Sequence, residues 1–429
     1  MSQRYSSFAA YKDSSSDWLG KIPDHWQEMR LGTLFKRVKE TNHPRAELLS
    51  VYRDHGVVPK SSRDDNFNKA SEDLSSYQLV RKGDLVLNKM KTWQGSIAIS
   101  DYEGIVSPAY FTYRSKPKIV DKIAHPQFLH YLLRSGNYIS QYLRCSKGIR
   151  VNQWDLDPDL FKVLSVLIPP LDEQRRIAAF LDHETAKVDT LIAKQERLIQ
   201  LLEEKRQAVI SHAIERREGD RMARLAHFIN LLPGYAFKSQ TFSKNPNDTP
   251  LLRGINVGVG STKWDETVNF SGESRAVQEF FLEAGDIVLG MDRPWIKEGA
   301  RVAKIAASDL PCLLVQRVAR LRAINGLDQD FLLLALKSNE FRSYIESDLT
   351  GVSVPHLSPE QIKGFRIPVI DRDEQKRRVT QVKTVTTKID LTVQKSRKSI
   401  ALLSERRASV ISAAVTGKID TRDWKPYNV

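Results

Sequence analysis

The sequence predicts an α+β protein made of two strand-rich, mixed α/β globular units in tandem, each followed by a long helix. Three observations support this architecture. Asp172-Glu173-Gln174 recurs as Asp373-Glu374-Gln375, and the two segments then stay in register without a gap to Ala213 and Ala414. Short apolar runs bounded by Gly, Pro, Asn and Asp fill the regions upstream of both copies. The repeated segments carry apolar residues at helical spacing.

The duplication extends upstream and sets the domain boundaries. Gly83-Asp84 corresponds to Gly285-Asp286, and Trp93 corresponds to Trp295. A chain of 429 residues is long enough for several domains with cores of their own. We expect five segments: a first globular unit at 1–171, a first helical region at 172–217, a second globular unit at 218–372, a second helical region at 373–418 and a tail at 419–429.

Within each globular unit the apolar runs predict short strands, followed by one helix and a closing strand. Pro169 and Pro170 can neither continue a strand nor sit inside a helix, so they mark the first junction. The expected strands are Asp84–Leu87, Ile97–Ile99 and Val163–Pro170 in the first unit, and Ile287–Leu289, Leu313–Val315 and Gly364–Pro368 in the second; the expected helices are Pro126–Ser135 and Asp330–Ser338.

The helical regions carry a coiled-coil seam, and Asp172 is a plausible N-cap for the first of them. The seam residues that we expect to pair the helices are Leu181, Val188, Ile192, Gln195, Ile199, Leu202 and Val209 in the first, and Val382, Ile389, Val393, Ser396, Ile400, Leu403 and Val410 in the second.

Polar seam positions favour antiparallel pairing. A parallel pair would set Arg206 against Arg407, and two facing guanidinium groups repel each other. An antiparallel pair instead brings Thr185 near Arg407, Gln195 near Ser396 and Arg206 near Thr386, and implies a pseudo-two-fold axis. The alternative is that each helix packs separately on its own globular unit.

Charge and cysteine usage restrict the class of protein. The chain has 66 Lys and Arg against 52 Asp and Glu, a formal charge of +14, which makes a polyanionic partner plausible, although solvated surface would also explain it. Cys145 and Cys312 form no CxxC pair and no signal peptide is evident, so we expect a cytoplasmic protein. Charged residues interrupt every apolar run, and we expect no membrane span.

Motifs for catalysis and metal binding are missing. The sequence has no G-x-x-x-x-G-K-[ST] phosphate loop, no H-E-x-x-H and no Asn-Pro-Pro-aromatic motif for amino-methylation. Asp155, Asp157 and Asp159 resemble a calcium loop, but Pro158 and the lack of a glycine at the sixth position argue against one. We therefore expect no catalytic residue, no metal and no cofactor in this chain.

Several segments resemble the specificity (S) subunits of type I restriction-modification systems. The resemblance rests on Asp17-Trp18-Leu19-Gly20-Lys21-Ile22-Pro23, on Lys82 through Lys91 with Trp93-Gln94-Gly95, on Gly104 through Tyr110, and on Ile168 through Gln174 before the first long helix. The second helical region, from Asp373 through Gly417, is similar to the family's second conserved region. The second globular unit departs from the pattern at Met291 through Trp295.

This resemblance implies a function without catalysis. Each globular unit would be a target recognition domain that reads one half of a bipartite, asymmetric double-stranded DNA target, and the helix pair would set the spacing between the halves. The subunit would position two modification subunits, which methylate adenine N6 with S-adenosylmethionine. Restriction subunits, where present, would add cleavage that depends on ATP and Mg²⁺.

Base reading needs donors and acceptors in the major groove, and Lys and Arg on phosphates add affinity. Two expected loops of the first unit concentrate such groups, and the repeat gives their counterparts in the second. Trp93 and Trp295, in the same loops, are interpreted as core anchors shared by both copies. The candidate DNA-binding residues are Lys89, Lys91, Gln94, Lys147, Arg150, Asn152 and Gln153, with Arg293, Lys297, Ser353 and His356 in the second unit.

Some alternatives stay open at this point. The second helical region is strongly basic, so it could run near phosphates or dock on the modification subunits. An enzyme with a degenerate site is the main rival function. A coiled-coil scaffold without DNA specificity is another, although the two polar, basic loop clusters argue against it.

Overall fold

The computed structural model describes residues 5–53, 55–63, 70–148, 154–272, 274–348 and 356–425. It divides into two compact units. Unit 1 comprises Met1–Gln195 and Lys398–Val429, and unit 2 comprises Glu196–Arg397. Both long helices run from one unit into the other along the chain, so each unit contains part of each helix.

Unit 1 contains fourteen described strands and five short helices besides its part of the long ones. The strands are β1 (Tyr11–Asp13), β2 (Lys21–Pro23), β3 (Gln27–Arg30), β4 (Phe35–Val38), β5 (Leu49–Tyr52), β6 (Gly56–Pro59), β7 (Gln78–Val80), β8 (Leu85–Asn88), β9 (Ile97–Ile99), β10 (Gly104–Val106), β11 (Tyr110–Ser115), β12 (Ser146–Lys147), β13 (Asp155–Leu156) and β14 (Ser165–Ile168). The helices are α1 (Leu31–Leu34), α2 (Pro117–Ile123), α3 (Pro126–Leu133), α4 (Gly136–Arg144) and α5 (Pro158–Lys162), followed by the long helix α6 (Leu171–Ile214).

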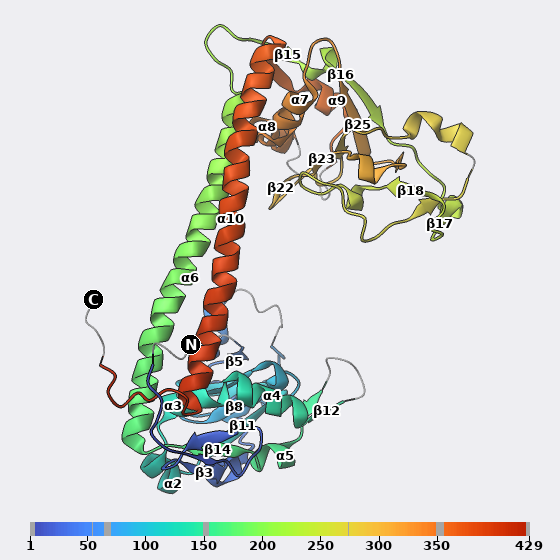
Figure 1. Ribbon diagram of the computed structural model, residues 1–429. Helices are drawn as coiled ribbons and strands as arrows, with labels where there is room; N and C mark the ends of the chain where they lie inside the picture. Colours follow the sequence, from blue (N-terminus) through green and yellow to red (C-terminus); the bar gives the residue numbers. More distant parts are fainter. Residues whose placement is uncertain are drawn as a thin grey trace. The chain divides into compact units, whose positions relative to one another are not determined.

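Unit 2 has a similar order of strands and helices before its long helix, but its additional short strands differ (Figure 1). Its strands are β15 (Arg221–Arg224), β16 (Ile229–Pro233), β17 (Phe242–Ser243), β18 (Thr249–Leu252), β19 (Asn269–Phe270), β20 (Ile287–Gly290), β21 (Trp295–Ile296), β22 (Gly299–Ala300), β23 (Val302–Lys304), β24 (Leu313–Leu314), β25 (Val318–Ala323) and β26 (Arg366–Val369). Its helices are α7 (Gln329–Lys337), α8 (Asn339–Asp348) and α9 (Pro359–Gly364), followed by the long helix α10 (Arg372–Val415).

The central sheets of the two units have the same topology. Unit 1 has an antiparallel sheet in the order β4-β11-β8-β9, and unit 2 has one in the order β16-β25-β20-β23. The last strand before each long helix pairs antiparallel with the strand that precedes the central sheet in the sequence, β14 with β3 and β26 with β15. The duplication seen in the sequence is therefore a duplication of fold.

The core of unit 1 gathers aromatic and aliphatic side chains from the sheet, from α3 and α4 and from the start of α6. Trp26, Phe128, Tyr138 and Phe180 are fully buried in it, and burial of each large apolar side chain contributes about 1.5–3 kcal/mol. The end of α10 and the tail complete this core, with Val415 and Ile419 packed into it. Segments near both ends of the chain meet here, because the Asp420 N–H donates to the Ser6 carbonyl at 2.8 Å.

The repeated Gln of the Asp-Glu-Gln motif anchors each long helix. Buried Gln174 accepts from the His125 N–H at 2.7 Å and donates to the Ile123 and Pro169 carbonyls. Gln375 makes the equivalent bonds, accepting from the Asp328 N–H at 2.8 Å and donating to the Gly326 and Ile370 carbonyls. The motif that reveals the duplication is therefore a structural tie between helix and globular unit.

The long helices pair antiparallel within each unit. In unit 1 the Arg407 Nε lies 2.8 Å from Asp189 Oδ1, and in unit 2 the Arg206 Nε lies 3.2 Å from Asp390 Oδ1. Some of the predicted seam residues are buried, namely Leu181, Val188 and Val410 in unit 1 and Val382, Ile389 and Val393 in unit 2. Others are half-buried: Ile192, Ile199, Leu202, Val209, Ile400 and Leu403.

Two details of the helices differ from the expectation. Each arginine contacts an aspartate one turn from the threonine expected to meet it, because its long side chain reaches along the partner helix to an opposite charge. Asp172 is not the N-cap, since α6 already begins at Leu171 and Asp172 lies in its first turn. In the second copy it is Asp371 whose carboxylate accepts from the Glu374 N–H at 2.9 Å. The pairing expected for Gln195 and Ser396 joins residues of different units and stays a prediction.

Candidate nucleic-acid interface

The Gly-Asp turn that both copies share is structural. Gly83 and Gly285 both adopt positive φ, at 87° and 95°. The buried carboxylate that follows accepts from a backbone N–H three residues earlier and pairs with an arginine on the neighbouring strand. In unit 1 this is Asp84 with Arg114 at 3.2 Å, and in unit 2 Asp286 with Arg322 at 2.9 Å. These charges hold the sheet and are not available to a ligand.

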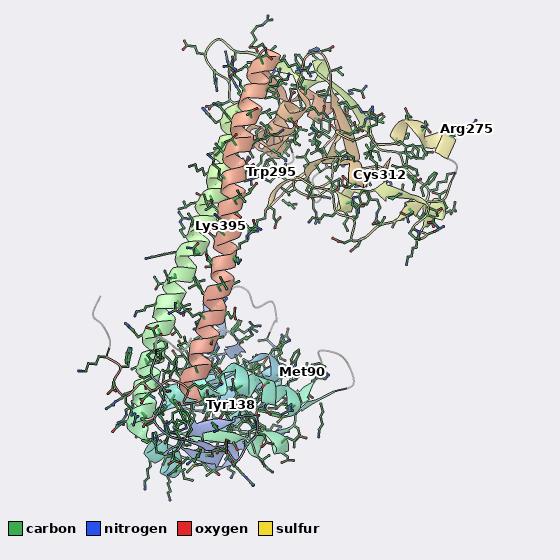
Figure 2. All side chains as sticks on the ribbon, viewed as in Figure 1. Met90, Tyr138, Arg275, Trp295, Cys312 and Lys395 are labelled. Atoms are coloured by element: carbon green, nitrogen blue, oxygen red, sulfur yellow. The ribbon has the colours of Figure 1, made fainter. Side chains whose placement is uncertain are left out.

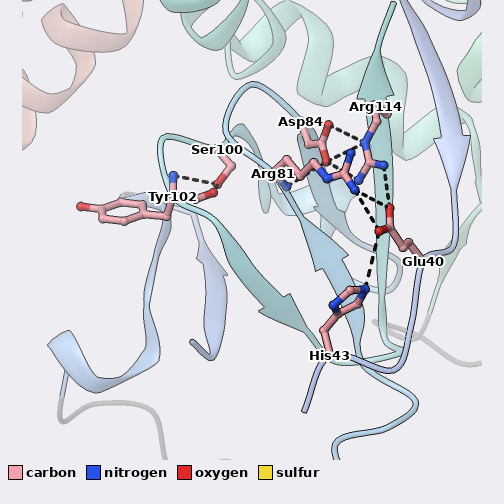
Figure 3. Close-up of polar contacts among 7 residues, drawn as sticks. All are labelled: Glu40, His43, Arg81, Asp84, Ser100, Tyr102 and Arg114. Carbon is pink, nitrogen blue, oxygen red and sulfur yellow. Dashed lines mark hydrogen bonds and ion pairs between the residues drawn. The ribbon is translucent and has the colours of Figure 1, made fainter. Parts of the chain in front are cut away.

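A second carboxylate joins this network in each unit: Glu283 pairs with Arg322 at 3.0 Å in unit 2, and Glu40 takes part in unit 1 (Figure 3). Glu40 accepts from Arg114 at 2.8 Å and from Arg81 at 2.9 Å, and His43 lies 3.6 Å away. The hydrogen bond from Arg114 lowers the pKa of Glu40, and Arg81 lowers it further. Burial raises the pKa of Asp84, which the Arg81 N–H and Arg114 oppose. Arg81 and Arg114 are thus neutralised by their neighbours.

The two loops predicted to read DNA in unit 1 are brought together. The Leu156 N–H of β13 donates to the Lys89 carbonyl at 3.0 Å. The Trp93 and Trp154 rings contact each other in a tilted arrangement, with centroids 4.9 Å apart and planes at 59°. The Trp93 indole N–H donates to the Met90 carbonyl. The loop after β8 and the β12–β13 hairpin therefore form one surface, which we call the unit 1 loop surface.

The predicted residues on this surface differ in their exposure and in the contacts that their side chains make. Lys91 and Gln94 are exposed, and Lys147 is exposed but forms an ion pair with Asp157 at 3.1 Å. Lys89 is half-buried; its ammonium donates to the Pro108 carbonyl and lies 4.8 Å from the centroid of the Phe111 ring. Arg150, Asn152 and Gln153, also predicted from the sequence, lie outside the described residues.

Unit 2 builds an equivalent surface, which we call the unit 2 loop surface. The Leu357 N–H donates to the Met291 carbonyl at 2.8 Å, the counterpart of the bond between Leu156 and Lys89 in unit 1. Figure 2 labels Met90 and Trp295, which belong to the corresponding loops of the two units. Predicted residues Arg293 and Lys297 are exposed here, and Ser353 lies outside the described residues.

The chemistry of the unit 2 loop surface centres on one carboxylate. Asp292 contacts His356 at 2.7 Å and Arg317 at 2.8 Å, and its backbone carbonyl accepts from Arg301 at 2.9 Å. Burial raises the pKa of Asp292, but the hydrogen bonds from His356 and Arg317 outweigh it and leave this pKa below its usual value. Predicted His356 is thus held by Asp292, and the backbone of Arg293 is strained, with a φ of 46°.

Sequence reasoning missed three arginines near these loops: Arg37 in unit 1, and Arg301 and Arg317 in unit 2. Arg37 lies on β4. Its guanidinium carbon is 4.0 Å from the centroid of the Phe111 ring, which Lys89 also contacts. The alternation Lys36-Arg37-Val38 is visible in the sequence. The sequence alone does not show whether Lys36 or Arg37 faces the loop surface; the strand register shows that it is Arg37.

The described part of the chain shows neither a metal-binding cluster nor a membrane-spanning helix. Within those residues, no group of three or more His, Cys, Asp or Glu side chains is placed to hold a metal ion. None of the described helices combines the length and apolar character needed to cross a membrane.

Comparison with known proteins gives consistent results. The family model described as "Type I restriction modification DNA specificity domain" matches residues 23–203 and 234–400. The chain is 24% identical over 430 residues to the type I restriction enzyme MjaVIII specificity subunit of Methanocaldococcus jannaschii, covering 94% of this chain and 95% of that one. It is 35% identical over 167 residues to the EcoAI specificity subunit of Escherichia coli, covering 38% and 28%.

Solved structures share the fold. A chain from a study of complex assembly and conformational transition of the type I R-M system has a TM-score of 0.70, at 19% identity, and the match covers 92% of this chain and 98% of that one. The HsdS subunit of Thermoanaerobacter tengcongensis has a TM-score of 0.52, at 19% identity, with 93% and 98% covered.

Proposed function

The chain belongs to the family of type I restriction-modification DNA specificity domains, and we propose that it reads a bipartite, asymmetric target in double-stranded DNA, one half with each unit. One observation carries this proposal. The two units use equivalent backbone hydrogen bonds to join equivalent loops, yet the exposed side chains on those loops differ. The same scaffold with two different surfaces suits a target whose two halves have different sequences.

The family assignment also supports a proposal about partners. The relatives are named specificity subunits of type I restriction enzymes. We propose that this chain positions two modification subunits, one for each half of the target. S-adenosylmethionine, ATP and Mg²⁺ would then be bound and used by the partner subunits. The complex would work in the cytoplasm, where the DNA lies.

Methylation mapping tests this function. The full chain is expressed with its modification subunit, and methylated adenines are located by single-molecule sequencing of the host DNA. We expect one bipartite motif with a methylated adenine in each half. The purified chain alone, incubated with DNA, Mg²⁺ and S-adenosylmethionine, is expected to transfer no methyl group. Methyl transfer by the chain alone would contradict the assignment.

A further inference from the structure

Two cations share one aromatic ring at the edge of the unit 1 loop surface. Phe111 on β11 lies between β4 and β8 in the sheet. The guanidinium carbon of Arg37, from β4, is 4.0 Å from the ring centroid, and the ammonium of Lys89, just after β8, is 4.8 Å from it. Both distances are within the range of a cation–π contact. We call Arg37, Lys89 and Phe111 the cation pair site.

The positive charges at this site lack an ion-pair partner among the described residues. The nearest acidic influence on Lys89 is the field of Asp155, which raises the pKa of Lys89. Lys39 adds a third positive charge nearby. Burial lowers the pKa of Lys89, and repulsion from Arg37 lowers it further. An anion bound between the two cations would remove this repulsion.

The second copy of the fold shows that the cations are not needed for the sheet. Strand register makes Leu87 equivalent to Leu289, so Phe111, opposite Leu87, corresponds to Ala319, opposite Leu289. By the same pairing Arg37 corresponds to Leu231, and Lys89 corresponds to Met291. Unit 2 therefore fills these three positions with apolar residues. Two cations in unit 1 replace side chains that would pack without repulsion.

The cation pair site adjoins the unit 1 loop surface, so a ligand bound to that surface would be close to both cations. The Lys89 carbonyl accepts from Leu156 of the β12–β13 hairpin, and the Lys89 ammonium donates to the Pro108 carbonyl, which leaves further donors on the same nitrogen. Arg37 is exposed. The two charged groups lie within about 9 Å of each other, because both contact one ring. A phosphate has several acceptor oxygens, so one phosphate can accept from both groups at about 2.8 Å each.

We propose that Arg37 and Lys89 together clamp one backbone phosphate of the DNA, so that they position unit 1 on the duplex and do not read a base. The proposal rests on the proposed function, since it needs DNA on the unit 1 loop surface. Phosphate contacts fix register and orientation without carrying sequence information. Base reading by unit 1 is then left to other groups of the loop surface, such as Lys91 and Gln94.

The salt dependence of DNA binding tests the clamp without knowledge of the target. Binding of the full chain to a 40-base-pair duplex of random sequence is measured by fluorescence anisotropy at several salt concentrations. Each neutralised phosphate contributes about 0.9 to the slope of log K against log salt. We expect Arg37→Gln and Lys89→Gln each to weaken binding. The double variant should lose about 0.9 from the slope, since both cations hold the same phosphate.

Matched variants separate the clamp from general charge. Lys36→Gln removes the same charge from the next position of β4, on the opposite face of the strand, and should leave the slope unchanged. Arg37→Lys keeps the charge and should keep the slope. Thermal unfolding of each variant excludes loss of fold as the cause.

Three results would overturn the clamp. A slope that is unchanged in the double variant shows that the site does not touch DNA. A loss near 1.8 shows two separate phosphates. A loss for Lys36→Gln equal to that for Arg37→Gln shows that only overall charge matters. Failure of the proposed function is distinct, because the complex with the modification subunit would then methylate no bipartite motif, whatever the salt slopes of the variants.

Discussion

Gln174 illustrates how much one buried amide contributes to unit 1. Gln174→Ala leaves the His125 N–H and the Ile123 and Pro169 carbonyls without their partner, at a cost of about 1–3 kcal/mol. We expect the unfolding midpoint of unit 1 to fall by roughly 2–4 °C per kcal/mol. Arg175→Ala is the matched control, because this exposed neighbour only pairs with Asp172, and it should change stability by less than about 0.5 kcal/mol. Equal midpoints for the two variants would refute the anchoring role.

His130 makes the stability of unit 1 depend on pH. Burial, together with the positive charge of Arg134, lowers the pKa of His130 to about 4, and the Ile99 backbone and Asp182 only partly oppose this shift. The Arg134 Nη1 lies 2.7 Å from the ring Nε2, which accepts as the neutral imidazole. The folded state favours neutral His130, because the folded pKa lies below the value of 6.5 of a free histidine. The contribution of neutral His130 to the free energy of unfolding is therefore complete above pH 6.5 and is lost as the pH falls toward 4.

A substitution isolates this contribution from the titration of carboxylates. His130→Gln keeps an acceptor for Arg134 but cannot take up a proton. We expect its unfolding midpoint to fall less steeply than that of the unaltered chain between pH 6.5 and pH 4, a difference worth up to about 3 kcal/mol. Parallel curves across this interval would show that the fold does not hold His130 neutral.

At the scale of residues, the sequence predicts the scaffold better than the site. Asp84 and Gln174 stand out because both copies share them, and both prove to be structural ties. Residues that differ between the copies carry the surface chemistry, so the repeat cannot identify them. Arg37 illustrates this limit, because its counterpart is Leu231 and its contact with Phe111 depends on strand register.

Cross-linking can test the orientation of the helices in each unit. Cysteines that replace Asp189 and Arg407 should be joined by a short bis-maleimide, because these side chains meet within unit 1. Cysteines in place of Arg206 and Asp390 should be joined in unit 2. The native Cys145 and Cys312 are buried and should react slowly. Product is detected by a change of mobility on a denaturing gel.

The control pair is the one that a parallel coiled coil would bring together. Cysteines in place of Asp189 and Asp390 occupy equivalent positions of the two copies, and we expect no intramolecular product from them. Efficient joining of this pair, with none for Asp189 and Arg407, would require parallel helices.

At the scale of elements, periodicity was sufficient for the long helices and insufficient for their polar contacts. Apolar residues every three or four positions predict a seam, and Leu181 and Val382 are buried in it. Pairing rules place Arg407 beside Thr185, whereas the guanidinium group extends to Asp189. Backbone spacing alone cannot show how far a flexible side chain reaches. Short strands such as β21 and β22 were not predicted, since two residues carry no periodic signal.

The whole molecule combines two different loop surfaces with two helices that continue from one unit into the other. Both helices contain 44 residues, and each contributes one part to each unit. If each unit reads half of a target, the helices connect the two DNA-binding units. The number of base pairs between the half-sites should then depend on helix length, whereas the bases read in each half should not.

Insertion of one heptad in both helices tests this dependence. Seven residues are inserted beside Gln195 in α6 and beside Ser396 in α10, which keeps the apolar seam in register and lengthens each helix by about 10 Å. At about 3.4 Å per base pair, the spacer of the methylated motif should grow by about three base pairs. Insertion in α6 alone is the control, and it should abolish methylation because the seams no longer match. Methylation mapping of the complex with the modification subunit gives the spacer directly. If the doubly extended chain still directs methylation to the original spacer, the helices do not set the distance, and the two half-sites must be held by contacts elsewhere in the complex.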